Sequence, residues 1–272
     1  MNVEAWWDIG RKNTERHMDA HLRAIEELGL DGIAIMLNRQ RDTTWGLSLY
    51  PYEACVRFAR RLRDMGVRVT LTSWIRPDRA FVDDLLGELP QLATDCGADI
   101  EFDTEGASWG AGLPRSRGGG LYLALGLALF QEIGGRWTTT TVTSQPYWDL
   151  SIHAAGLCPQ AYSIWDRRHC DDRYRVGGCY GPGKRQLLAW KKHQRSSPPT
   201  QEIVMGLPAW AQRGYPGSSS PEDIMEICWN TAKLAGSKRV RYWSWKWIAG
   251  KRGDVRGYAY RFLKGKKGDG TQ

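Results

Sequence analysis

The chain has 272 residues, 42% of them hydrophobic and 25% charged, which are the proportions of an ordinary globular protein. We expect neither a membrane span nor a secretory signal, since no apolar run approaches roughly 20 residues and the first residues contain no apolar core. The net charge of +8 favours an anionic partner, such as a bacterial wall polymer, a membrane surface or nucleic acid. No basic stripe with interleaved aromatic residues accompanies a nucleic-acid motif, so we expect no nucleic-acid partner.

Segments with the patterns of strands and helices alternate along the chain. Strands are predicted at 3–9, 32–37, 67–75, 98–105, 137–144, 157–163, 202–210 and 239–248. Helices are predicted at 14–29, 51–66, 77–92, 117–135, 183–194 and 220–236. Eight strands alternating with helices at this length predict the α/β fold of a (β/α)₈ TIM barrel. A doubly wound open sheet is the alternative, but its glycine-rich phosphate loop is absent after the first strand.

The chain contains no internal repeat and no linker, so a single domain is predicted. We expect the barrel to occupy residues 1–265, with a polar loop insertion around 164–183 on its catalytic face. The remaining residues, 266–272, are expected to form a flexible basic tail. We expect the protein to be a monomer.

The predicted fourth strand, ADIEFDTEG at 98–106, carries an acid at every second position. These acids are Asp99, Glu101, Asp103 and Glu105. A period of two puts all four on one face of a strand. Ile100 and Phe102 suit the opposite face, which covering helices would bury, so we expect the acids to point into the barrel. Glu105 would then lie nearest the C-terminal mouth, where the active sites of this fold are found.

Crowded carboxylates in a poorly solvated site cannot all ionise, so some of their pKa values must rise. One protonated acid beside one ionised acid is the arrangement that glycoside hydrolysis requires. We interpret Asp103 and Glu105 as the working pair and the two earlier acids as buried support. The alternative is that these acids only form ion pairs with inward-facing cations, such as Arg241 or Lys246.

The same run resembles the fourth-strand motif D-x-x-D-x-D-x-E of chitinase-type glycoside hydrolases, family eighteen. Glu105 matches the final acid, Asp103 the Asp before it, and Glu101 the Asp before that, whereas Ala98 replaces the first Asp. The resemblance implies that Glu105 protonates the leaving oxygen. It also implies that Asp103 orients the N-acetyl group of the substrate, whose carbonyl acts as the nucleophile.

The shorter element D-x-E also resembles the lysozyme-type muramidases of family twenty-five, which share the barrel. There a further Asp near the end of the first strand takes part, and Asp8 is the candidate here. PQAYS is similar to the M-x-Y element of the chitinase type, which matches Tyr162 to a tyrosine that binds the N-acetyl oxygen, with Gln160 replacing Met. YWSWKW resembles the strand whose Trp forms the floor of the sugar subsite, a role for Trp243 or Trp245.

Tryptophan is unusually frequent, with 14 residues, and many of them follow predicted strands. Indole rings offer flat apolar surfaces on which sugar rings stack. We therefore expect several tryptophans, and one acid of the fourth strand, to bind the substrate at the mouth of the barrel. For some of these tryptophans, the alternative is that they pack in the barrel core. The expected binding residues are Glu101, Trp74, Trp109, Trp148, Trp165, Trp210, Trp243 and Trp245.

The six cysteines include no C-x-x-C pair, which argues against a zinc site. Cys55 and Cys228 fall on apolar helix faces and are expected in the core. Cys170 and Cys179 flank a polar loop, where a disulfide and two free thiols both stay possible.

The five histidines show no metal-ligand spacing, and we expect His17 and His21 on the surface of a helix. A barrel phosphodiesterase with a metal held by Glu101 and Asp103 is an alternative, although it would need histidine ligands that the sequence does not offer. We therefore expect no metal and no cofactor.

These patterns predict a glycosidase, of the muramidase or N-acetylglucosaminidase type, that cuts β-1,4 bonds next to N-acetylated sugars. The expected polysaccharide is bacterial peptidoglycan, with chitin second. A basic hydrolase without a signal resembles a bacteriophage endolysin or a virion-associated lysin, which implies residence in the host cytoplasm before it reaches the cell wall, or in the virion. The alternatives are a sugar-binding barrel without catalysis, suggested by Ala98 and Gln160, and a scaffold bound to polymers by charge alone.

Overall fold

The computed structural model describes residues 1–39, 42, 44–75, 79–103, 131, 137–142, 155–160, 202–209, 221–234 and 236–268. The chain divides into two compact units. The terminal unit comprises Met1–Asp31, Gln160–Ser196 and Val204–Gln272. The central unit comprises Gly32–Pro159 and Ser197–Ile203.

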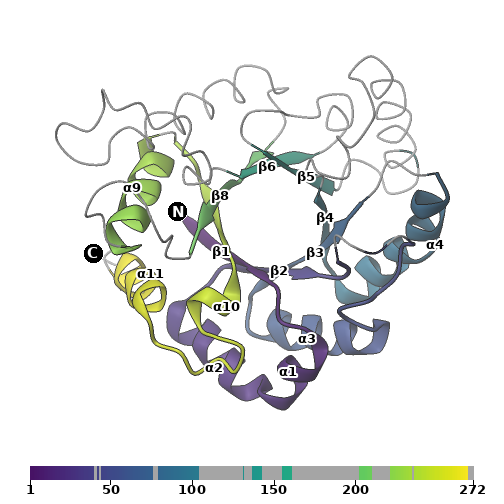
Figure 1. Cartoon of the computed structure of the whole chain (residues 1–272), viewed down its shortest axis with the longest axis horizontal. Coiled ribbons are helices and arrows are strands. Elements are labelled where there is room, and N and C mark those ends of the chain that lie inside the picture. Colours follow the sequence, from purple (N-terminus) through teal and green to yellow (C-terminus); the bar gives the residue numbers. More distant parts are fainter. Residues whose placement is uncertain are drawn as a thin grey trace. The chain divides into compact units, whose positions relative to one another are not determined.

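The terminal unit contains parallel strands whose neighbours are distant in sequence. Strand β1 (Asn2–Trp7) pairs with β9 (Arg239–Trp243), which pairs in turn with β8 (Met205–Pro208). Around these strands lie α1 (Arg11–Arg16), α2 (Met18–Leu28), α9 (Pro221–Leu234), α10 (Trp245–Ile248) and α11 (Tyr258–Gly268), as Figure 1 shows. The register places Glu4 opposite Arg241 and Arg241 opposite Gly206.

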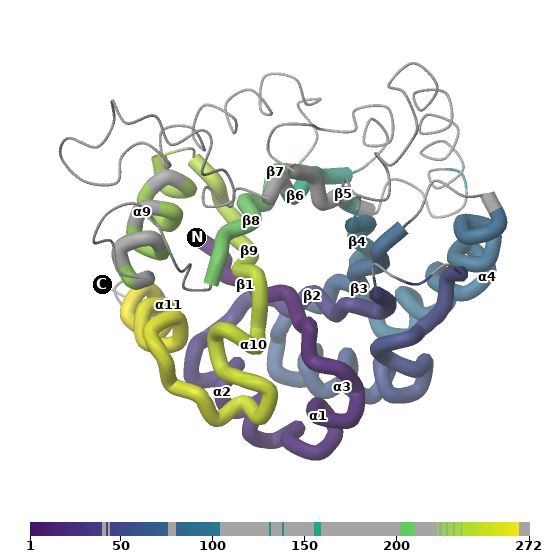
Figure 2. The backbone as a smooth tube through the Cα atoms, viewed as in Figure 1, coloured from purple at the N-terminus to yellow at the C-terminus, as the bar shows by residue number. Residues whose placement is uncertain are grey.

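The central unit contains a curved parallel sheet. Its strands β2 (Gly32–Met36), β3 (Arg68–Trp74), β4 (Asp99–Asp103) and β5 (Trp137–Val142) pair in sequence order. Strand β6 (Gly156–Gln160) pairs with β5 and with the short β7 (Glu202–Ile203). Helices α3 (Tyr52–Asp64) and α4 (Arg79–Cys96) pack together on the convex side of β2, β3 and β4, as the tube in Figure 2 shows.

Helix α3 illustrates how the sequence determines an element of this unit. Its charges suit the helix dipole, with Glu53 in the first turn and Arg61 and Arg63 in the last. Gly66 follows the helix with a φ of 76°, a conformation that glycine adopts without steric cost. The helix buries one apolar face, which consists of Ala54, Cys55, Phe58, Ala59 and Leu62. Each large apolar side chain buried there contributes roughly 1.5–3 kcal/mol.

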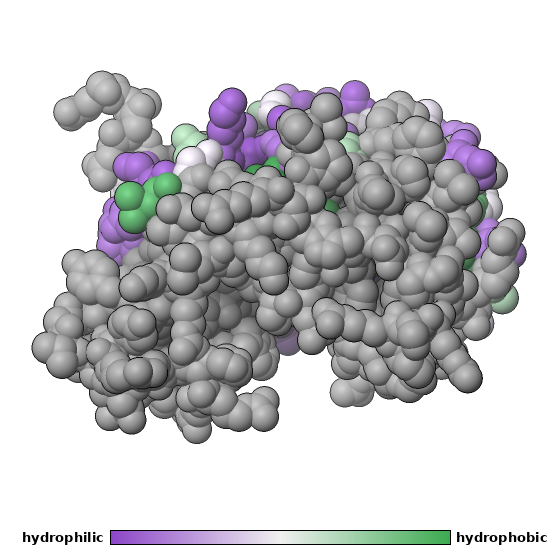
Figure 3. Space-filling model, turned by 90° about the horizontal axis from the view of Figure 1, so that it is seen from above, coloured by the Kyte–Doolittle hydropathy of each residue, from purple (hydrophilic) through white to green (hydrophobic). Residues whose placement is uncertain are grey.

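Helix α2 covers the terminal unit's strands in the same way. It buries His21, Leu22, Ile25 and Leu28 and ends at Gly29, whose φ of 56° terminates the helix in the left-handed region. The buried His21 shows that our prediction of a surface position for this residue was wrong. On the face of the molecule in Figure 3, the described residues at the surface are mostly hydrophilic.

The predicted alternation of strands and helices is confirmed in the described residues, with several differences at the boundaries. The helix predicted at 14–29 divides at His17 into α1 and α2, and the strand predicted at 202–210 divides into β7 and β8. The eighth predicted strand ends at Trp243 and is followed by α10.

Helix α11 was not predicted at all. It continues through Gly268, so the first residues of the expected flexible tail are helical, and Lys266 Nζ lies 2.7 Å from Glu226 Oε2 of α9. The helices predicted at 117–135 and 183–194 and the insertion at 164–183 lie outside the described residues. Of the helices in the described part of the chain, none is both long and apolar enough to cross a membrane.

Candidate active site

Two carboxylates of β4 are buried on one face of the central sheet. Glu101 is fully buried and Asp103 is 6% exposed, while Ile100 and Phe102 are buried on the opposite face. Asp99 begins the strand and is exposed, so our prediction that it lies buried as support was wrong. The predicted burial of Glu101 is confirmed. Glu105 lies outside the described residues, and its role stays a prediction.

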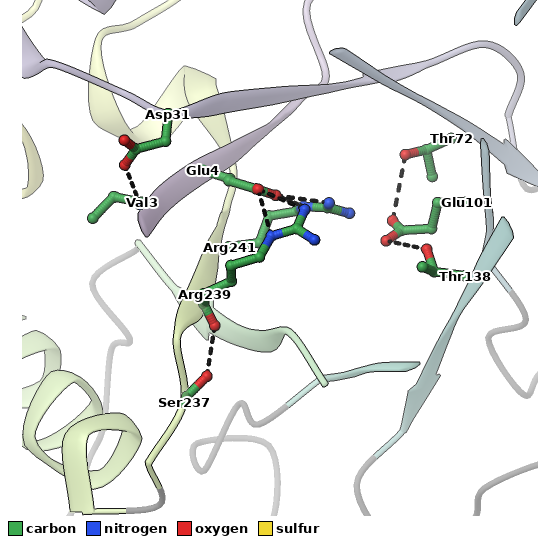
Figure 4. A network of polar contacts seen from close by, with 9 residues as sticks. All are labelled: Val3, Glu4, Asp31, Thr72, Glu101, Thr138, Ser237, Arg239 and Arg241. Carbon is green, nitrogen blue, oxygen red and sulfur yellow. Dashed lines mark hydrogen bonds and ion pairs between the residues drawn. The ribbon is translucent and has the colours of Figure 1, made fainter. Parts of the chain in front are cut away.

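Two threonine hydroxyls hold the Glu101 carboxylate from the neighbouring strands (Figure 4). Thr72 of β3 and Thr138 of β5 are its register partners, so all three side chains share one face of the sheet. Thr72 Oγ1 donates to one carboxylate oxygen and Thr138 Oγ1 to the other, each at 3.4 Å. These distances exceed the usual 2.5–3.0 Å for O–H···O bonds. The hydroxyls therefore orient this acid without a strong interaction.

Trp74 ends β3 directly opposite Asp103, and the parallel register puts their side chains on the same face. Asn38, which follows β2 and is fully buried, holds the Trp74 backbone. Its Oδ1 accepts the Trp74 backbone N–H at 2.8 Å, and its Nδ2 donates to the Trp74 carbonyl at 2.9 Å. The Asn38 amide thus extends the pairing of β3 beyond the last residue of β2.

The Trp74 indole N–H is a buried donor without a hydrogen-bond partner among the described residues. Trp74 is 2% exposed, so its ring offers no face for a sugar to stack on, which corrects our expectation of a stacking role. A buried polar group left unpaired costs roughly 1–3 kcal/mol. The indole of Trp45, by contrast, donates to Ser73 Oγ at 3.0 Å. The central unit therefore places one unsatisfied donor on the same side of the sheet as Asp103.

In the terminal unit, Asp8 follows β1 and is paired with Lys246 of α10. Lys246 Nζ lies 2.8 Å from Asp8 Oδ2, and the Lys246 backbone N–H donates to Asp8 Oδ1 at 3.2 Å. The Asp8 side chain is 9% exposed and that of Lys246 40%. Because β1 and β9 are parallel, Asp8 and α10 both lie beyond the carboxyl ends of neighbouring strands. Asp8 is therefore held at the carboxyl ends of parallel strands, where α/β folds bind their ligands.

A second buried acid of this unit has a structural role. Arg239 and Arg241 of β9 each donate two hydrogen bonds of 2.7–2.9 Å to Glu4 of β1, one guanidinium to each carboxylate oxygen (Figure 4). Burial raises the pKa of Glu4, but the charges and hydrogen bonds of Arg241 and Arg239 outweigh it and hold the pKa below its ordinary value. Arg241 also lies 5.4 Å from the centre of the Trp6 ring. Glu4 is therefore a fixed anion in the core.

The two tryptophans proposed for the sugar floor occupy different environments. Trp243 is partly exposed and meets Trp6 edge-to-face at 5.6 Å. Trp245 is fully buried, stacks on Trp7 at 5.2 Å and donates its indole N–H to His21 Nδ1 at 3.1 Å. The Trp245 ring thus has no exposed face for a sugar, which corrects our expectation of a binding role and leaves Trp243 as the candidate.

Other predicted residues fall in two groups. Cys55 and Cys228 are both buried, which confirms their predicted core positions. Several residues lie outside the described part of the chain, and their roles stay predictions: Tyr162, Trp109, Trp148, Trp165, Trp210, Cys170 and Cys179. Among the described residues, no group of three or more His, Cys, Asp or Glu side chains is placed to hold a metal ion.

Sequence reasoning missed Asn38 and the pairing of Asp8 with Lys246. A signal for Asn38 exists, because a polar residue follows directly after the apolar run GIAIML at the end of a strand. The partner of Asp8 had no such signal, since it lies 238 positions away in sequence.

Neither a protein-family model nor a curated protein sequence matches this chain. Several solved structures share its fold. They include a GH113 β-1,4-mannanase, at a TM-score of 0.64 and 12% identity over 97% of this chain and 96% of that one. A chitinase from Bacteroides thetaiotaomicron has a TM-score of 0.62 and 13% identity over 89% of each chain.

The spore cortex-lytic enzyme SleL of Bacillus megaterium QM B1551 has a TM-score of 0.56 and 12% identity, over 93% of this chain and 72% of that one. At these identities the likeness establishes the fold alone. The parallel strands and covering helices of this chain follow the fold of TIM-barrel-like glycoside hydrolases.

Proposed function

We propose that this protein is a glycosidase that cleaves β-1,4 bonds in polymers of N-acetylated amino sugars, with bacterial peptidoglycan as its substrate. One observation carries the proposal: Glu101 and Asp103 are buried on one face of β4, and this strand leads to Glu105 two residues later. The fold supports it, because the similar solved structures include chitin-, mannan- and spore-cortex-degrading enzymes by name.

In this proposal, Glu105 is the general acid and Asp103 assists. Glu105 gives its proton to the oxygen of the leaving sugar while the bond from that oxygen to the anomeric carbon breaks. Asp103 orients the N-acetyl group, whose carbonyl oxygen attacks the same carbon. Glu105 then takes a proton from a water molecule whose oxygen attacks the anomeric carbon and breaks its bond to the carbonyl oxygen, which restores the N-acetyl group. Tyr162 donates a hydrogen bond to the N-acetyl oxygen.

Residues around this pair bind and orient the sugar. The Trp74 indole N–H supplies a donor on the Asp103 side of the sheet, supported by its lack of a partner among the described residues. Trp243 forms the floor on which a ring stacks. Asp8, oriented by Lys246, contributes a carboxylate at the ends of the terminal strands.

We further propose that the strands close into a complete (β/α)₈ barrel as one domain over residues 1–265, active as a monomer without a metal or cofactor. The pairing of β5 with β6 supports closure. The net charge of +8 supports attraction to an anionic wall at low ionic strength. These properties suit an endolysin or virion-associated lysin that leaves the host cytoplasm for the cell wall.

Two other functions are favoured by particular observations. A chitinase-like enzyme is favoured by the D-x-D-x-E pattern of β4 and the residues after it, and by the structural likeness to a chitinase. A sugar-binding barrel without catalysis is favoured by Ala98 and Gln160, which depart from the chitinase-type pattern.

The test is release of reducing ends from purified peptidoglycan and from chitin oligomers, with mass spectrometry of the fragments. We expect wild type to cut peptidoglycan and Glu105→Gln to lose roughly 10²–10⁴-fold in rate, the contribution of a general acid–base group. Asp84→Asn is a matched control, because Asp84 is an exposed acid of α4. A folded Glu105→Gln variant with wild-type rate would refute the mechanism. Binding without cleavage by wild type would instead establish the sugar-binding barrel.

A further inference from the structure

Trp247 differs from the other described tryptophans because the residue is 46% exposed. Most of them are at most 8% exposed: Trp6, Trp7, Trp45, Trp74, Trp229 and Trp245. A single exposed aromatic residue is common on protein surfaces and indicates nothing by itself. The neighbours of Trp247 make it informative.

The Lys246 ammonium lies close to both the Asp8 carboxylate and the Trp247 ring, and we call these three groups the row. Lys246 Nζ lies 2.8 Å from Asp8 Oδ2 and over the Trp247 ring, 5.9 Å from its centre. An ammonium carries three N–H donors, and the Lys246 side chain is 40% exposed. Lys246 can therefore bind a second anionic group beside the Trp247 ring while it stays paired with Asp8.

Helix α10 holds this row in a fixed position. Trp245 and Ile248 are fully buried and anchor the helix, while the Trp247 backbone N–H donates to the Ser244 carbonyl at 3.0 Å. The Gly250 N–H donates to the Lys246 carbonyl at 3.1 Å. A ring presented by an anchored backbone loses little conformational freedom when a ligand binds.

We propose that Trp247 and Lys246 form a binding subsite for a sugar ring that carries or adjoins a carboxylate. The sugar stacks on the Trp247 indole, and its carboxylate pairs with the Lys246 ammonium. This inference rests on the proposed function, because the row includes Asp8. It predicts that the subsite prefers an acidic glycan, such as peptidoglycan, to neutral chitin.

The charges of the chain segment that carries Lys246 and Trp247 favour an anionic ligand. Exposed Lys251 and Arg252 lie three and four residues after the end of α10 and add two cations to this segment. The nearby acids are Asp8, which is paired with Lys246, and exposed Asp254. The cations in this segment therefore outnumber the acids.

Sedimentation with insoluble peptidoglycan and with chitin tests the subsite, using proteins that also carry Glu105→Gln so that bound polymer is not cut. We expect Trp247→Ala to bind peptidoglycan about tenfold more weakly, the effect of losing one aromatic contact of roughly 1.4 kcal/mol. Trp247→Phe should retain most of the affinity, because it keeps an aromatic face. Lys246→Gln should weaken binding to peptidoglycan several-fold more than it weakens binding to chitin.

Lys233→Gln and Leu234→Ala are the matched controls, since both residues are exposed on α9 of the same unit, Leu234 at 75%. Binding by Trp247→Ala at the level of Leu234→Ala, or no binding of the parent protein to peptidoglycan, would overturn the subsite. Equal losses on both polymers for Lys246→Gln would overturn its preference for carboxylates. If the protein with Glu105 intact cuts no bond but the variants show these binding differences, the proposed function is wrong and the subsite stands.

Discussion

Glu4 in the terminal unit and Glu101 in the central unit are both buried glutamates on parallel strands, yet their partners differ (Figure 4). Glu4 accepts four hydrogen bonds of 2.7–2.9 Å from two guanidinium groups. Glu101 accepts hydrogen bonds of 3.4 Å from two threonine hydroxyls. Burial of a carboxylate alone therefore does not identify a working acid.

The chemistry of the partner separates the two acids. Guanidinium groups carry a permanent charge and donate only, so they hold Glu4 in its ionised form. A hydroxyl both donates and accepts, so it can serve a carboxylate or a carboxylic acid. The terminal unit thus uses its buried acid to fix strands β1 and β9, whereas in the central unit two threonine hydroxyls orient Glu101.

The largest change in the free energy of unfolding is expected for Glu4→Gln. Removing one partner of a buried ion pair leaves uncompensated charge, here on two arginines, and costs about 3–5 kcal/mol. We expect the free energy of unfolding, measured by urea titration, to fall by that amount. Glu15→Gln is the control, because Glu15 pairs with Arg11 at 3.3 Å on an exposed helix surface, where a pair is worth below ~1 kcal/mol.

His21 provides a second test, because its environment opposes charge. Burial, reinforced by the charge of His17, lowers the pKa of His21 from 6.5 to about 4, against the opposing effects of the Lys251 carbonyl and Asp254. The unfolded chain therefore binds the proton more readily, and stability falls as the pH drops from about 6.5 to about 4. We expect a loss of roughly 2–3 kcal/mol across this range.

The measurement is the free energy of unfolding at several pH values, for wild type and His21→Gln. The variant should be less stable at pH 7 but should lose less stability between pH 6.5 and 4, because it has no group to protonate there. His17→Gln should lose slightly less stability than wild type over this range, because it removes a charge that lowers the pKa of His21. An identical slope for wild type and His21→Gln would contradict the assignment.

The sequence predicted much of the fold because the relevant signals are local. Alternation predicted the burial of Glu101, Ile100 and Phe102, since the side chains of a strand point to opposite faces in turn. The prediction failed for Asp99, because it is the first residue of β4 and water reaches it at this end of the strand. Periodicity does not report where an element ends.

The contacts of the site could not be predicted, because they depend on register between distant segments. Glu4 and Arg241 are 237 positions apart, and only the pairing of β1 with β9 places them opposite each other. Trp245 illustrates the reverse error: its place after a strand suggested a sugar platform, but α10 turns the ring into a packed cluster with Trp7 and His21.

A smaller change of stability is expected for Glu101→Gln. An amide of the same shape can accept from one threonine hydroxyl and donate to the other, so we expect a loss near 1 kcal/mol, the scale of a single hydrogen bond. The rate of cleavage should fall at least tenfold if the Glu101 carboxylate supports Asp103, two residues along the strand, in catalysis. A stability loss as large as that of Glu4→Gln would remove the contrast between the two units.

The smallest stability effect is expected for Trp74→Phe, which deletes a buried N–H that has no partner among the described residues. Loss of packing volume and relief of the unpaired donor oppose each other, so the free energy of unfolding should change by less than about 1 kcal/mol. Trp45→Phe is the matched control, because the Trp45 N–H donates to Ser73 Oγ and its loss should cost about 1 kcal/mol more.

The same pair of variants tests whether the Trp74 donor serves a ligand. Removing a donor that binds the N-acetyl oxygen should raise the KM for an N-acetylated oligosaccharide about fivefold, the effect of one neutral hydrogen bond of roughly 1 kcal/mol. Trp45→Phe should leave KM unchanged, because its N–H is already occupied within the fold. If Trp74→Phe gains stability and keeps its KM, the unpaired N–H is only a structural cost, and the proposed mechanism is left with Tyr162 and Asp103 to recognise the N-acetyl group.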